Sequence, residues 1–510
     1  MKMTRPVRTL LAVLTATAAT APLALAAGPA QAAPKPSAYK NLPNGTKTAK
    51  TLVIGIDGTR YDKLLLADAP RIKALMADGL TAPSSLYADP LSPTVSGPGW
   101  STIATGVWPD KHGVKDNTFA GSHFNTYPSL GKRLETASAA TSTLVVASWN
   151  PVADTIFNGG ADLRIPESEN DNKTASDAAD YLAHGNPDAT FLHFDQVDGA
   201  GHSYGGASSQ YLAAIHSVDT LVGQVVDAVK SRPTYASEDW LIMVTTDHGH
   251  TDAGGHGGNS AFERQTFVVA DGAGYAPGSV RRDVKVVDIA PTVLQHEGVT
   301  VNPAWNLDGT PITGLAPDAF DSLRGSLQTR VDETGIDAGL TGFTHTPPAG
   351  WSIDNSAMPT GGVTEWRGWS FATDEFWTAA ERGQGRETNV RSRDVFAVAD
   401  SDEWDDAAHG AGQFDSTLVS PVYPVGGATS AVVGYATDYL VDGPQTGDVY
   451  ISFDGGAPQL VKSYRANVNT FESVTVNVPA GATTAQLKFR YTGTNSAFWT
   501  VDQVTLTPRG

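Results

Sequence analysis

The sequence predicts an α/β region with a mostly parallel sheet flanked by helices, followed by a smaller antiparallel β-sandwich. Short runs rich in Val, Ile and Leu alternate with helical segments as far as about residue 317, a pattern typical of a parallel sheet covered on both faces. From residue 344 onward, short β-like runs separated by Gly and Pro turns take over, which favours a sandwich. Three of the apolar runs in the first region end at an aspartate.

The N-terminus has the pattern of a signal peptide, predicted for residues 1–32. Lys2, Arg5 and Arg8 precede an apolar stretch at 10–27, and Ala-Gln-Ala follows at 30–32, giving a charged region, an apolar region and a cleavage signal. A membrane anchor is the alternative, but the stretch is rich in Ala and Thr and contains a proline. We therefore expect a secreted, extracellular protein. No later segment is expected to be long and apolar enough for stable membrane insertion.

Residues 33–48 are expected to form a linker, and residues 49–318 the α/β domain. The predicted strands are 52–56, 143–148, 190–194, 241–245 and 266–270, and the predicted helices are 69–78, 211–231 and 288–296. In the second helix, apolar side chains recur at helical spacing. This alternation of strands and helices predicts parallel strands joined by crossover helices.

Residues 319–343 are expected to link this domain to a β-sandwich at 344–510. The expected strands include 431–436, 448–453, 471–478, 485–491 and 497–506. Six of the eleven tryptophans lie in this region, and we interpret them as core rather than as ligand platforms. The acidic run at 402–406 is either a Ca²⁺ site or a solvated loop.

Composition excludes several classes of function. The chain has no cysteine, so thiol nucleophiles, thiolate metal sites and disulfides are ruled out. Its net charge of −19 argues against binding duplex nucleic acid, which needs a basic surface. An anionic substrate is still possible, because bound metal ions reverse the local field.

Carboxylates and imidazoles follow three of the predicted strands. Asp57 ends the first run, Asp198 and His202 follow the third, and Asp247 and His248 follow the fourth, with His256 close behind. Ligands bind at the carboxyl ends of strands in an open α/β sheet. This mixture of oxygen and nitrogen donors suits zinc or a similar divalent metal.

Ser96 is the candidate nucleophile. It precedes Gly97, Pro98 and Gly99, and we expect a helix to open shortly afterwards, at Ser101 or Thr102. The serine would then lie near a helix N-terminus, where anions bind well. A serine hydroxyl needs a base or a metal ion to become a good nucleophile.

Taken in order, these motifs resemble the alkaline phosphatase superfamily, and most of all its nucleotide pyrophosphatase/phosphodiesterase branch. The motifs are D57-G, P93-T-V-S96, T105-G-V-W-P-D-K-H112-G-V, D198-G-A-G-H202, D247-H248-G and G-H256-G. The resemblance implies an alkaline-phosphatase-like fold for the first domain. It also implies two metal sites, one formed by Asp198, His202 and His256 and the other by Asp57, Asp247 and His248, with Ser96 bridging them.

The same resemblance implies that Asn117, twenty-one positions after Ser96, binds a non-bridging phosphoryl oxygen. The implied activity is a zinc-dependent phosphodiesterase or nucleotide pyrophosphatase that acts through a phosphoserine intermediate. One departure from the branch is Gly97, which stands where an apolar or aromatic residue is usual and puts a nucleotide substrate in doubt. The C-terminal region loosely resembles jelly-roll modules of secreted bacterial hydrolases, for which a cell-wall or glycan ligand is possible.

Two other functions remain open. One is a broad-specificity phosphomonoesterase of the same fold, acting on phosphate monoesters instead of diesters. The other is a noncatalytic glycan-binding or adhesion protein in which the metal motifs are only structural. A sulfatase is disfavoured, because S96-G-P-G-W100 lacks the arginine of the sulfatase motif and the chain has no cysteine.

Overall fold

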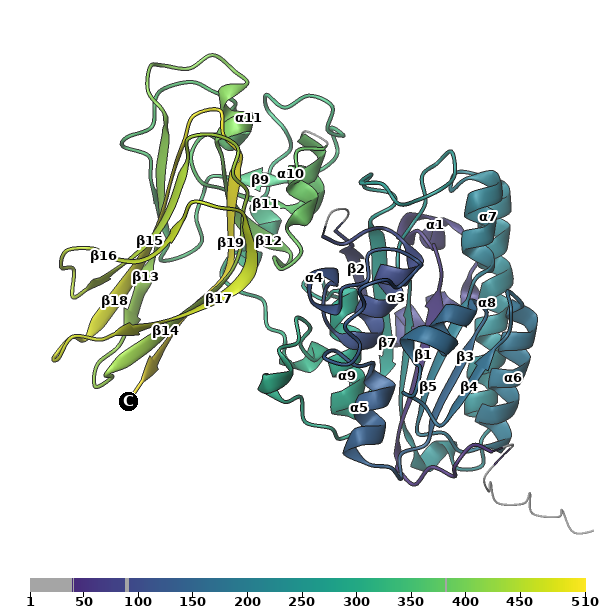
Figure 1. Cartoon of the computed structure of the whole chain (residues 1–510). Helices are drawn as coiled ribbons and strands as arrows, with labels where there is room; N and C mark the ends of the chain where they lie inside the picture. The colour runs from purple at the N-terminus through teal and green to yellow at the C-terminus, as the bar shows by residue number, and fades with distance from the viewer. Residues whose placement is uncertain (1–38, 40, 88–90, 381–382) are drawn as a thin grey trace, which may run out of the picture. The chain divides into compact units, whose positions relative to one another are not determined.

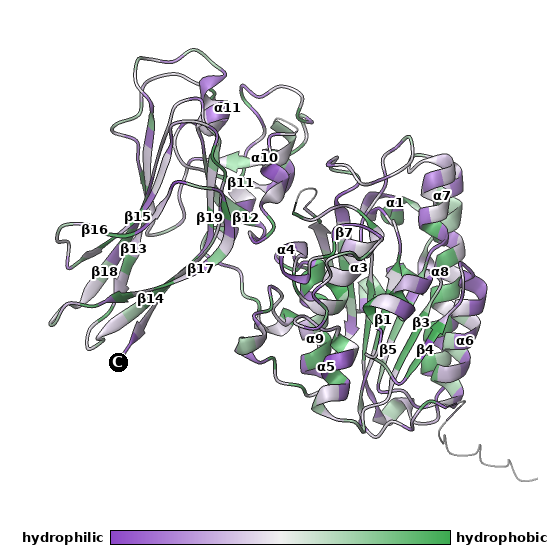
Figure 2. Cartoon of the chain, in the orientation of Figure 1, coloured by the Kyte–Doolittle hydropathy of each residue, from purple (hydrophilic) through white to green (hydrophobic). Residues whose placement is uncertain are grey.

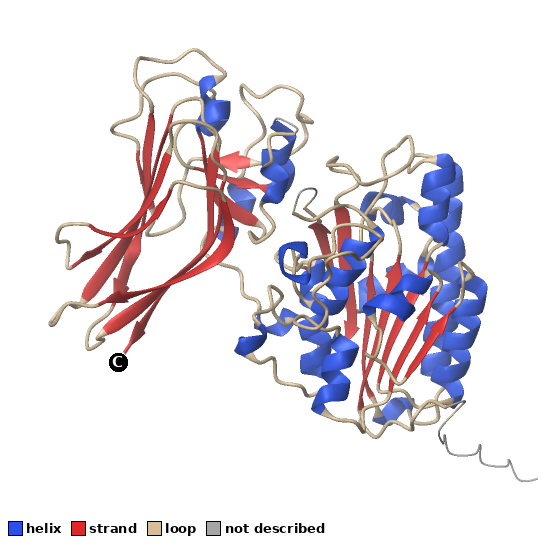
Figure 3. Ribbon diagram, viewed as in Figure 1, coloured by secondary structure: helices blue, strands red, loops and turns tan. Residues whose placement is uncertain are grey.

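A computed structural model describes residues 39, 41–87, 91–380 and 383–510. The predicted signal peptide at 1–32 lies outside these residues. The described part contains an eight-stranded sheet followed by two antiparallel sheets, so the predicted fold class is confirmed (Figures 1 and 3).

The eight-stranded sheet has the order β4-β3-β5-β1-β6-β7-β2-β8. Strands β4, β3, β5, β1 and β6 run parallel to one another, whereas β7 is antiparallel to both β6 and β2. The bounds are β1 Ala49–Ile56, β2 Leu80–Ser85, β3 Thr143–Ala147, β4 Leu163–Pro166, β5 Ala189–Phe194, β6 Asp239–Thr245, β7 Gln265–Gly272 and β8 Ser279–Val280. All five predicted strands are present, and β2, β4 and β8 were not predicted.

Helices cover both faces of this sheet (Figure 1). Along β1, Leu52 and Ile54 belong to one hydrophobic cluster and Val53 to another, because successive side chains of a strand point to opposite faces. The first cluster includes side chains of α2, α6 and α8, and the second includes those of α3, α5 and α9. The helices of this region are α1 Tyr61–Leu66, α2 Pro70–Asp78, α3 Ser96–Thr105, α4 Pro109–His112, α5 Leu130–Ala137, α6 Asp171–His184, α7 Gln196–Tyr204, α8 Ser209–Lys230 and α9 Ile289–His296. The central strands are the most hydrophobic elements between these layers (Figure 2).

Helix α8 corrects one expectation. Its 22 residues are long and apolar enough to cross a membrane by length and composition, whereas no segment after the N-terminus was expected to be. Its side chains Ile215, Val218, Val222 and Val225 are buried in the cluster that covers the sheet. The apolar stripe is therefore used in packing against the domain core.

The C-terminal region contains a five-stranded sheet, β10-β13-β18-β15-β16, and a six-stranded sheet, β17-β14-β19-β12-β11-β9. Side chains from both sheets form one hydrophobic core, as expected of a sandwich. The bounds are β9 Phe343–Thr344, β10 Ser352–Asp354, β11 Ser370–Thr373, α10 Asp374–Ala380, β12 Val395–Asp400, α11 Ser401–Asp405, β13 Phe414–Pro424, β14 Ser430–Tyr439, β15 Thr446–Phe453, β16 Gln459–Tyr464, β17 Val468–Asn477, β18 Thr484–Gly493 and β19 Phe498–Arg509.

The tryptophans of this region are core residues, as interpreted from the sequence. Their side chains are all buried, and the six are Trp351, Trp366, Trp369, Trp377, Trp404 and Trp499. Phe320 and Leu323, in the segment expected to be a linker, are buried in the same core.

Candidate active site

The carboxyl ends of three adjacent strands carry the candidate metal ligands. Strand β1 lies between β5 and β6 in the sheet, with Gly55 opposite both His193 and Thr245. Asp57 follows β1 directly, and Asp247 lies two residues beyond β6. Helix α7 follows β5 after a single residue and carries Asp198. The three aspartates therefore meet at one edge of the sheet, as predicted from parallel strands.

The first cluster contains Asp198, His202 and His256. Asp198 and His202 are one turn apart on α7, and the distance from Asp198 Oδ2 to His202 Nε2 is 3.3 Å. His256 Nε2 lies 3.5 Å from Asp198 Oδ1 and 3.0 Å from His202 Nε2. Donor atoms bound to one tetrahedral zinc ion at 2.0–2.2 Å lie about 3.3–3.6 Å apart. The two contacts of Asp198 have this spacing, whereas the contact between His202 and His256 is shorter, and all three side chains belong to one group of possible metal ligands.

The second cluster joins Asp57, Asp247 and His248 to Ser96. His248 Nε2 lies 3.4 Å from Asp57 Oδ1 and 3.4 Å from Asp247 Oδ2. Ser96 Oγ lies 3.5 Å from Asp57 Oδ1 and 3.4 Å from His248 Nε2. These four distances lie close to the spacing of donors on one metal ion, and Asp247 joins the group through its contact with His248.

In His248 and His256, a hydrogen bond at Nδ1 leaves Nε2 free to bind a metal. His248 Nδ1 contacts the carbonyl oxygen of Gly249 at 3.0 Å, and His256 Nδ1 contacts that of Thr94 at 2.8 Å. A carbonyl oxygen only accepts, so both Nδ1 atoms carry the proton. The unprotonated Nε2 atoms then face the clusters, as ligation requires.

The electrostatics of the site also fit a cation. Burial, reinforced by the neighbouring aspartates, raises the pKa of Asp57 well above its ordinary value, and burial does the same to Asp247. Burial also disfavours the charged form of Asp198, but hydrogen bonds from His202 and His250 outweigh it and hold that pKa well below its usual range. Asp247 Oδ2 is buried without a hydrogen-bond partner. Divalent ions would compensate this buried negative charge.

Ser96 is the first residue of α3, which runs from Ser96 to Thr105. The expected helix start at Ser101 or Thr102 was wrong, because the Gly-Pro-Gly segment forms the first turn. Proline is tolerated there, since the N–H that it lacks has no partner within the helix. Gly99 permits close packing, because a Cβ at that position would lie 2.7 Å from Asp247 Cβ. The serine is therefore at the positive end of the helix dipole.

Asn117 lies beside the first turn of α3, where Ser96 and Gly97 stand. Its Oδ1 accepts a hydrogen bond of 2.7 Å from the backbone N–H of Gly97, which leaves its amide NH₂ as the donating group. A Cβ on Gly97 would lie 2.6 Å from the carbonyl oxygen of Asp116. The loop that carries Asn117 therefore occupies the space that a side chain at position 97 would need. This is a steric reason for glycine where the family usually has an apolar or aromatic residue.

Two residues that the sequence did not assign to the site hold Asp57 in place. Trp100 Nε1 donates to Asp57 Oδ2 at 2.9 Å, and His193 Nε2 contacts the same oxygen at 3.1 Å. His193 Nδ1 accepts from the backbone N–H of Trp149, so its Nε2 carries the proton. His193 therefore donates to Asp57, and the grouping of Asp57, His193 and Asp195 is not a third metal site.

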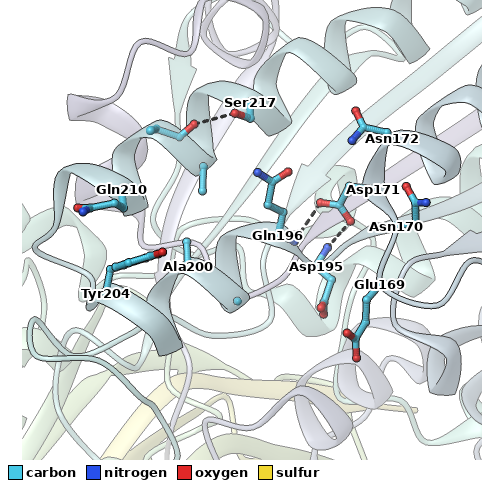
Figure 4. Close-up of a pocket in the computed structure, with 13 residues that line it drawn as sticks. Glu169, Asn170, Asp171, Asn172, Asp195, Gln196, Ala200, Tyr204, Gln210 and Ser217 are labelled. Carbon is cyan, nitrogen blue, oxygen red and sulfur yellow. Dashed lines mark hydrogen bonds between the residues drawn. The ribbon is translucent and has the colours of Figure 1, made fainter.

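Asp171 positions helix α7. Its carboxylate accepts from the backbone N–H groups of Asp195 and Gln196, both at 2.9 Å (Figure 4). These are donors at the start of α7, which need a partner from outside the helix. The residues lie in a cleft of 610 Å³ that runs along α7 and α8. No sequence motif marked Asp171, because its partners are backbone atoms 24 and 25 positions away.

Comparisons with known proteins agree with this geometry. The family described as type I phosphodiesterase / nucleotide pyrophosphatase matches residues 51–150 and 147–384. A pyrophosphatase/phosphodiesterase of Schizosaccharomyces pombe is 25% identical over 228 residues, covering 40% of this chain and 46% of that protein. Ectonucleotide pyrophosphatase/phosphodiesterase family member 3 of Mus musculus is 25% identical over 227 residues, covering 41% of this chain and 25% of that protein.

The matches thus span less than half the length of these relatives. Among solved structures, murine ectonucleotide pyrophosphatase / phosphodiesterase 5 aligns with a TM-score of 0.42 at 16% identity, covering 51% of this chain and 98% of that one. The family match itself extends over more than half of the present chain. The protein therefore belongs to the type I phosphodiesterase / nucleotide pyrophosphatase family, in the alkaline phosphatase superfamily.

Proposed function

We propose that this protein is a secreted, metal-dependent hydrolase that cleaves phosphodiester or pyrophosphate bonds through a phosphoserine intermediate on Ser96. The observation that carries the proposal is the position of Ser96 Oγ. It lies at the start of α3, 3.4 Å from His248 Nε2 and 3.5 Å from Asp57 Oδ1. A hydroxyl among buried metal-type ligands supports the role of nucleophile over that of a turn residue.

Asp57, Asp247 and His248 would hold one ion, and Asp198, His202 and His256 the other. Two such ions, most simply Zn²⁺ given the mixed nitrogen and oxygen donors, would lower the pKa of the serine hydroxyl and neutralise phosphoryl charge. Family membership and the Asp/His clusters support divalent metal.

The protein's own groups account for the rest of the reaction. Ser96 Oγ passes its proton to solvent water and attacks phosphorus, and the P–O bond to the leaving alcohol or phosphate breaks, with the leaving oxygen taking a proton from solvent. Water then attacks the phosphoseryl ester, the P–O bond to Ser96 breaks, and the serine oxygen regains a proton as the phosphate product leaves. The amide of Asn117 donates to a non-bridging oxygen, and the dipole of α3 favours the developing negative charge.

Substrate preference and Ser96 can be tested together. We expect bis-p-nitrophenyl phosphate to be hydrolysed with a higher kcat/KM than p-nitrophenyl phosphate, and Ser96→Ala to abolish turnover. Ser101→Ala is the matched control, because Ser101 is buried on the same helix but bonds only the carbonyl of Gly97. A strong preference for the monoester would favour the phosphomonoesterase alternative. Full activity in Ser96→Ala would refute the mechanism.

A screen over nucleotides, glycerophosphodiesters and monoesters would then define the substrate. Asn117→Ala should lower kcat for diesters, since the amide is proposed to act on the phosphoryl group. An unchanged kcat would remove Asn117 from the site.

For the rest of the chain, we propose export directed by residues 1–32 and an accessory role for the β-sandwich at 344–510. Two relatives bear the names ectonucleotide pyrophosphatase/phosphodiesterase and venom phosphodiesterase. A glycan or cell-wall ligand of the sandwich would need surfaces other than its tryptophans, which are buried. The acidic run at 402–406 is left out of the metal proposal, because Glu403 pairs with Arg386 and Asp405 with His409.

A further inference from the structure

His250 is a fourth histidine at the first cluster, and its side chain is fully buried. Its Nε2 lies 2.7 Å from Asp198 Oδ1. The ring also meets those of His202 and His256 edge-on, with centroids 5.1 Å away in both cases. Asp198, His202, His250 and His256 together have donor atoms within 4.8 Å of one another. His250 is therefore either a fourth ligand or a partner of a ligand.

The distance distinguishes these two roles. The other contacts to Asp198, from His202 and His256, measure 3.3 and 3.5 Å, close to the spacing of about 3.3–3.6 Å between donors on one tetrahedral zinc. The His250 contact at 2.7 Å is instead the length of a charge-assisted hydrogen bond. A carboxylate oxygen only accepts, so Nε2 of His250 carries the proton. Nδ1, which is buried without a partner, is then an unprotonated acceptor.

The backbone around His250 holds the ring in this position. A Cβ on Gly201 would lie 2.5 Å from both Cδ2 and Nε2 of the imidazole, and one on Gly58 would lie 2.8 Å from Nε2. The ring is thus enclosed by the loop after β1 and by α7. The carbonyl of His250 also accepts from Arg60 Nη1 at 3.3 Å, which fixes the backbone of the residue.

We propose that His250 is a positioning residue that donates from Nε2 to Asp198 and fixes the carboxylate at the point where the two clusters meet. Asp198 belongs both to the group with His202 and His256 and to the group with Asp57 and His248. Fixing its orientation therefore sets the geometry of both sites. Residues that hydrogen-bond to a metal ligand without binding the metal themselves orient that ligand and raise its basicity. The inference rests on the proposed metal sites and adds a role for a residue outside them.

The test compares His250→Leu, which keeps the volume but removes the donor, with His250→Gln, whose side-chain amide restores an N–H at similar reach. Zn²⁺ affinity is measured by competition with a chromophoric chelator, and the visible spectrum of the Co²⁺-loaded protein reports the ligand set. His345→Leu is the control for general loss of packing, because His345 bonds only the carbonyl of Glu365.

We expect His250→Leu to weaken the affinity for at least one ion about 10–100-fold, His250→Gln to recover most of it, and His345→Leu to leave it unchanged. The Co²⁺ spectrum of His250→Gln should match that of the wild type, since no ligand is lost. Unchanged affinity in His250→Leu would overturn the inference, and so would a Co²⁺ spectrum in His250→Gln that shows loss of a nitrogen ligand. A wild-type protein that binds no metal would instead refute the proposed function itself.

Discussion

Trp100 offers a sharp test of how the site is held together. Its indole is fully buried, and its Nε1 donates to Asp57 Oδ2 at 2.9 Å. The ring packs edge-on against His193, the other donor to the same oxygen, with centroids 4.8 Å apart. Gly55 makes room for it, because a Cβ there would lie 2.3 Å from the indole. Trp100→Phe removes the donor and keeps an aromatic ring.

The expected loss of stability has two parts. A typical hydrogen bond contributes about 0.5–1.5 kcal/mol. The phenyl ring is roughly 40 Å³ smaller than the indole, and a cavity of that size costs about 1 kcal/mol. We therefore expect the free energy of unfolding of the metal-free protein to fall by about 1.5–2.5 kcal/mol. Because Asp57 is also less well oriented, metal affinity should fall about 10–100-fold.

Trp377→Phe is the matched control. Trp377 is also fully buried and also donates to an aspartate, Asp400 Oδ2, at 3.3 Å, but it lies in the β-sandwich. Chemical denaturation should show a comparable loss of stability in both variants, whereas chelator competition should show weaker metal binding only in Trp100→Phe. Equal metal affinity in Trp100→Phe and the wild type would refute the reasoning that the indole positions Asp57.

Three further predictions follow from the same geometry. Without metal, the melting temperature of the wild-type protein should fall relative to that of Asp57→Asn as pH rises from 5.5 to 8, because burial raises the pKa of Asp57 and its stabilising contribution is lost as the carboxyl is forced to ionise; calorimetry of the two metal-free proteins measures this difference, and a difference that does not change with pH would contradict the prediction. Gly97→Ala should lower kcat at least about 10-fold, since the new Cβ would meet the loop of Asn117 at 2.6 Å, while a chelator titration should show unchanged metal affinity; wild-type kcat would argue against a tight fit at this loop. Burial raises the pKa of Asp438 to about 7, so its ionisation should cost stability, at most about 4 kcal/mol, as pH rises from 4 to 7; Asp438→Asn should flatten that dependence in denaturant titrations, and an unchanged profile would disprove it.

The sequence predicted secondary structure best where a single hydrophobic pattern runs through a whole strand or helix. The buried strands β1, β5 and β6 are continuous apolar runs, and the apolar side chains of α8 recur at helical spacing. Strand β2 was not predicted, because Leu80–Ser85 contains a proline and several small polar residues. Its pairing with β7 comes from the tertiary fold rather than from local propensity.

The part of the candidate site that could be predicted consists of the residues that lie within sequence motifs. The predicted ligands and Ser96 do meet at the ends of adjacent strands, because chain order and parallel topology determine which side chains share an edge. The residues that orient them could not be found in the same way. Trp100, His193, Asp171 and His250 act through contacts with residues far away in the chain, and only the folded structure brings those partners together.

The central claim is that Ser96 becomes covalently phosphorylated during turnover. The most direct measurement is to quench the metal-loaded protein in acid during hydrolysis of bis-p-nitrophenyl phosphate and to analyse its peptides by mass spectrometry. The account predicts a phosphoryl or nitrophenyl-phosphoryl group on the peptide that contains Ser96, and none in Ser96→Ala. Rapid hydrolysis by a wild-type protein whose Ser96 peptide is never modified would contradict the account.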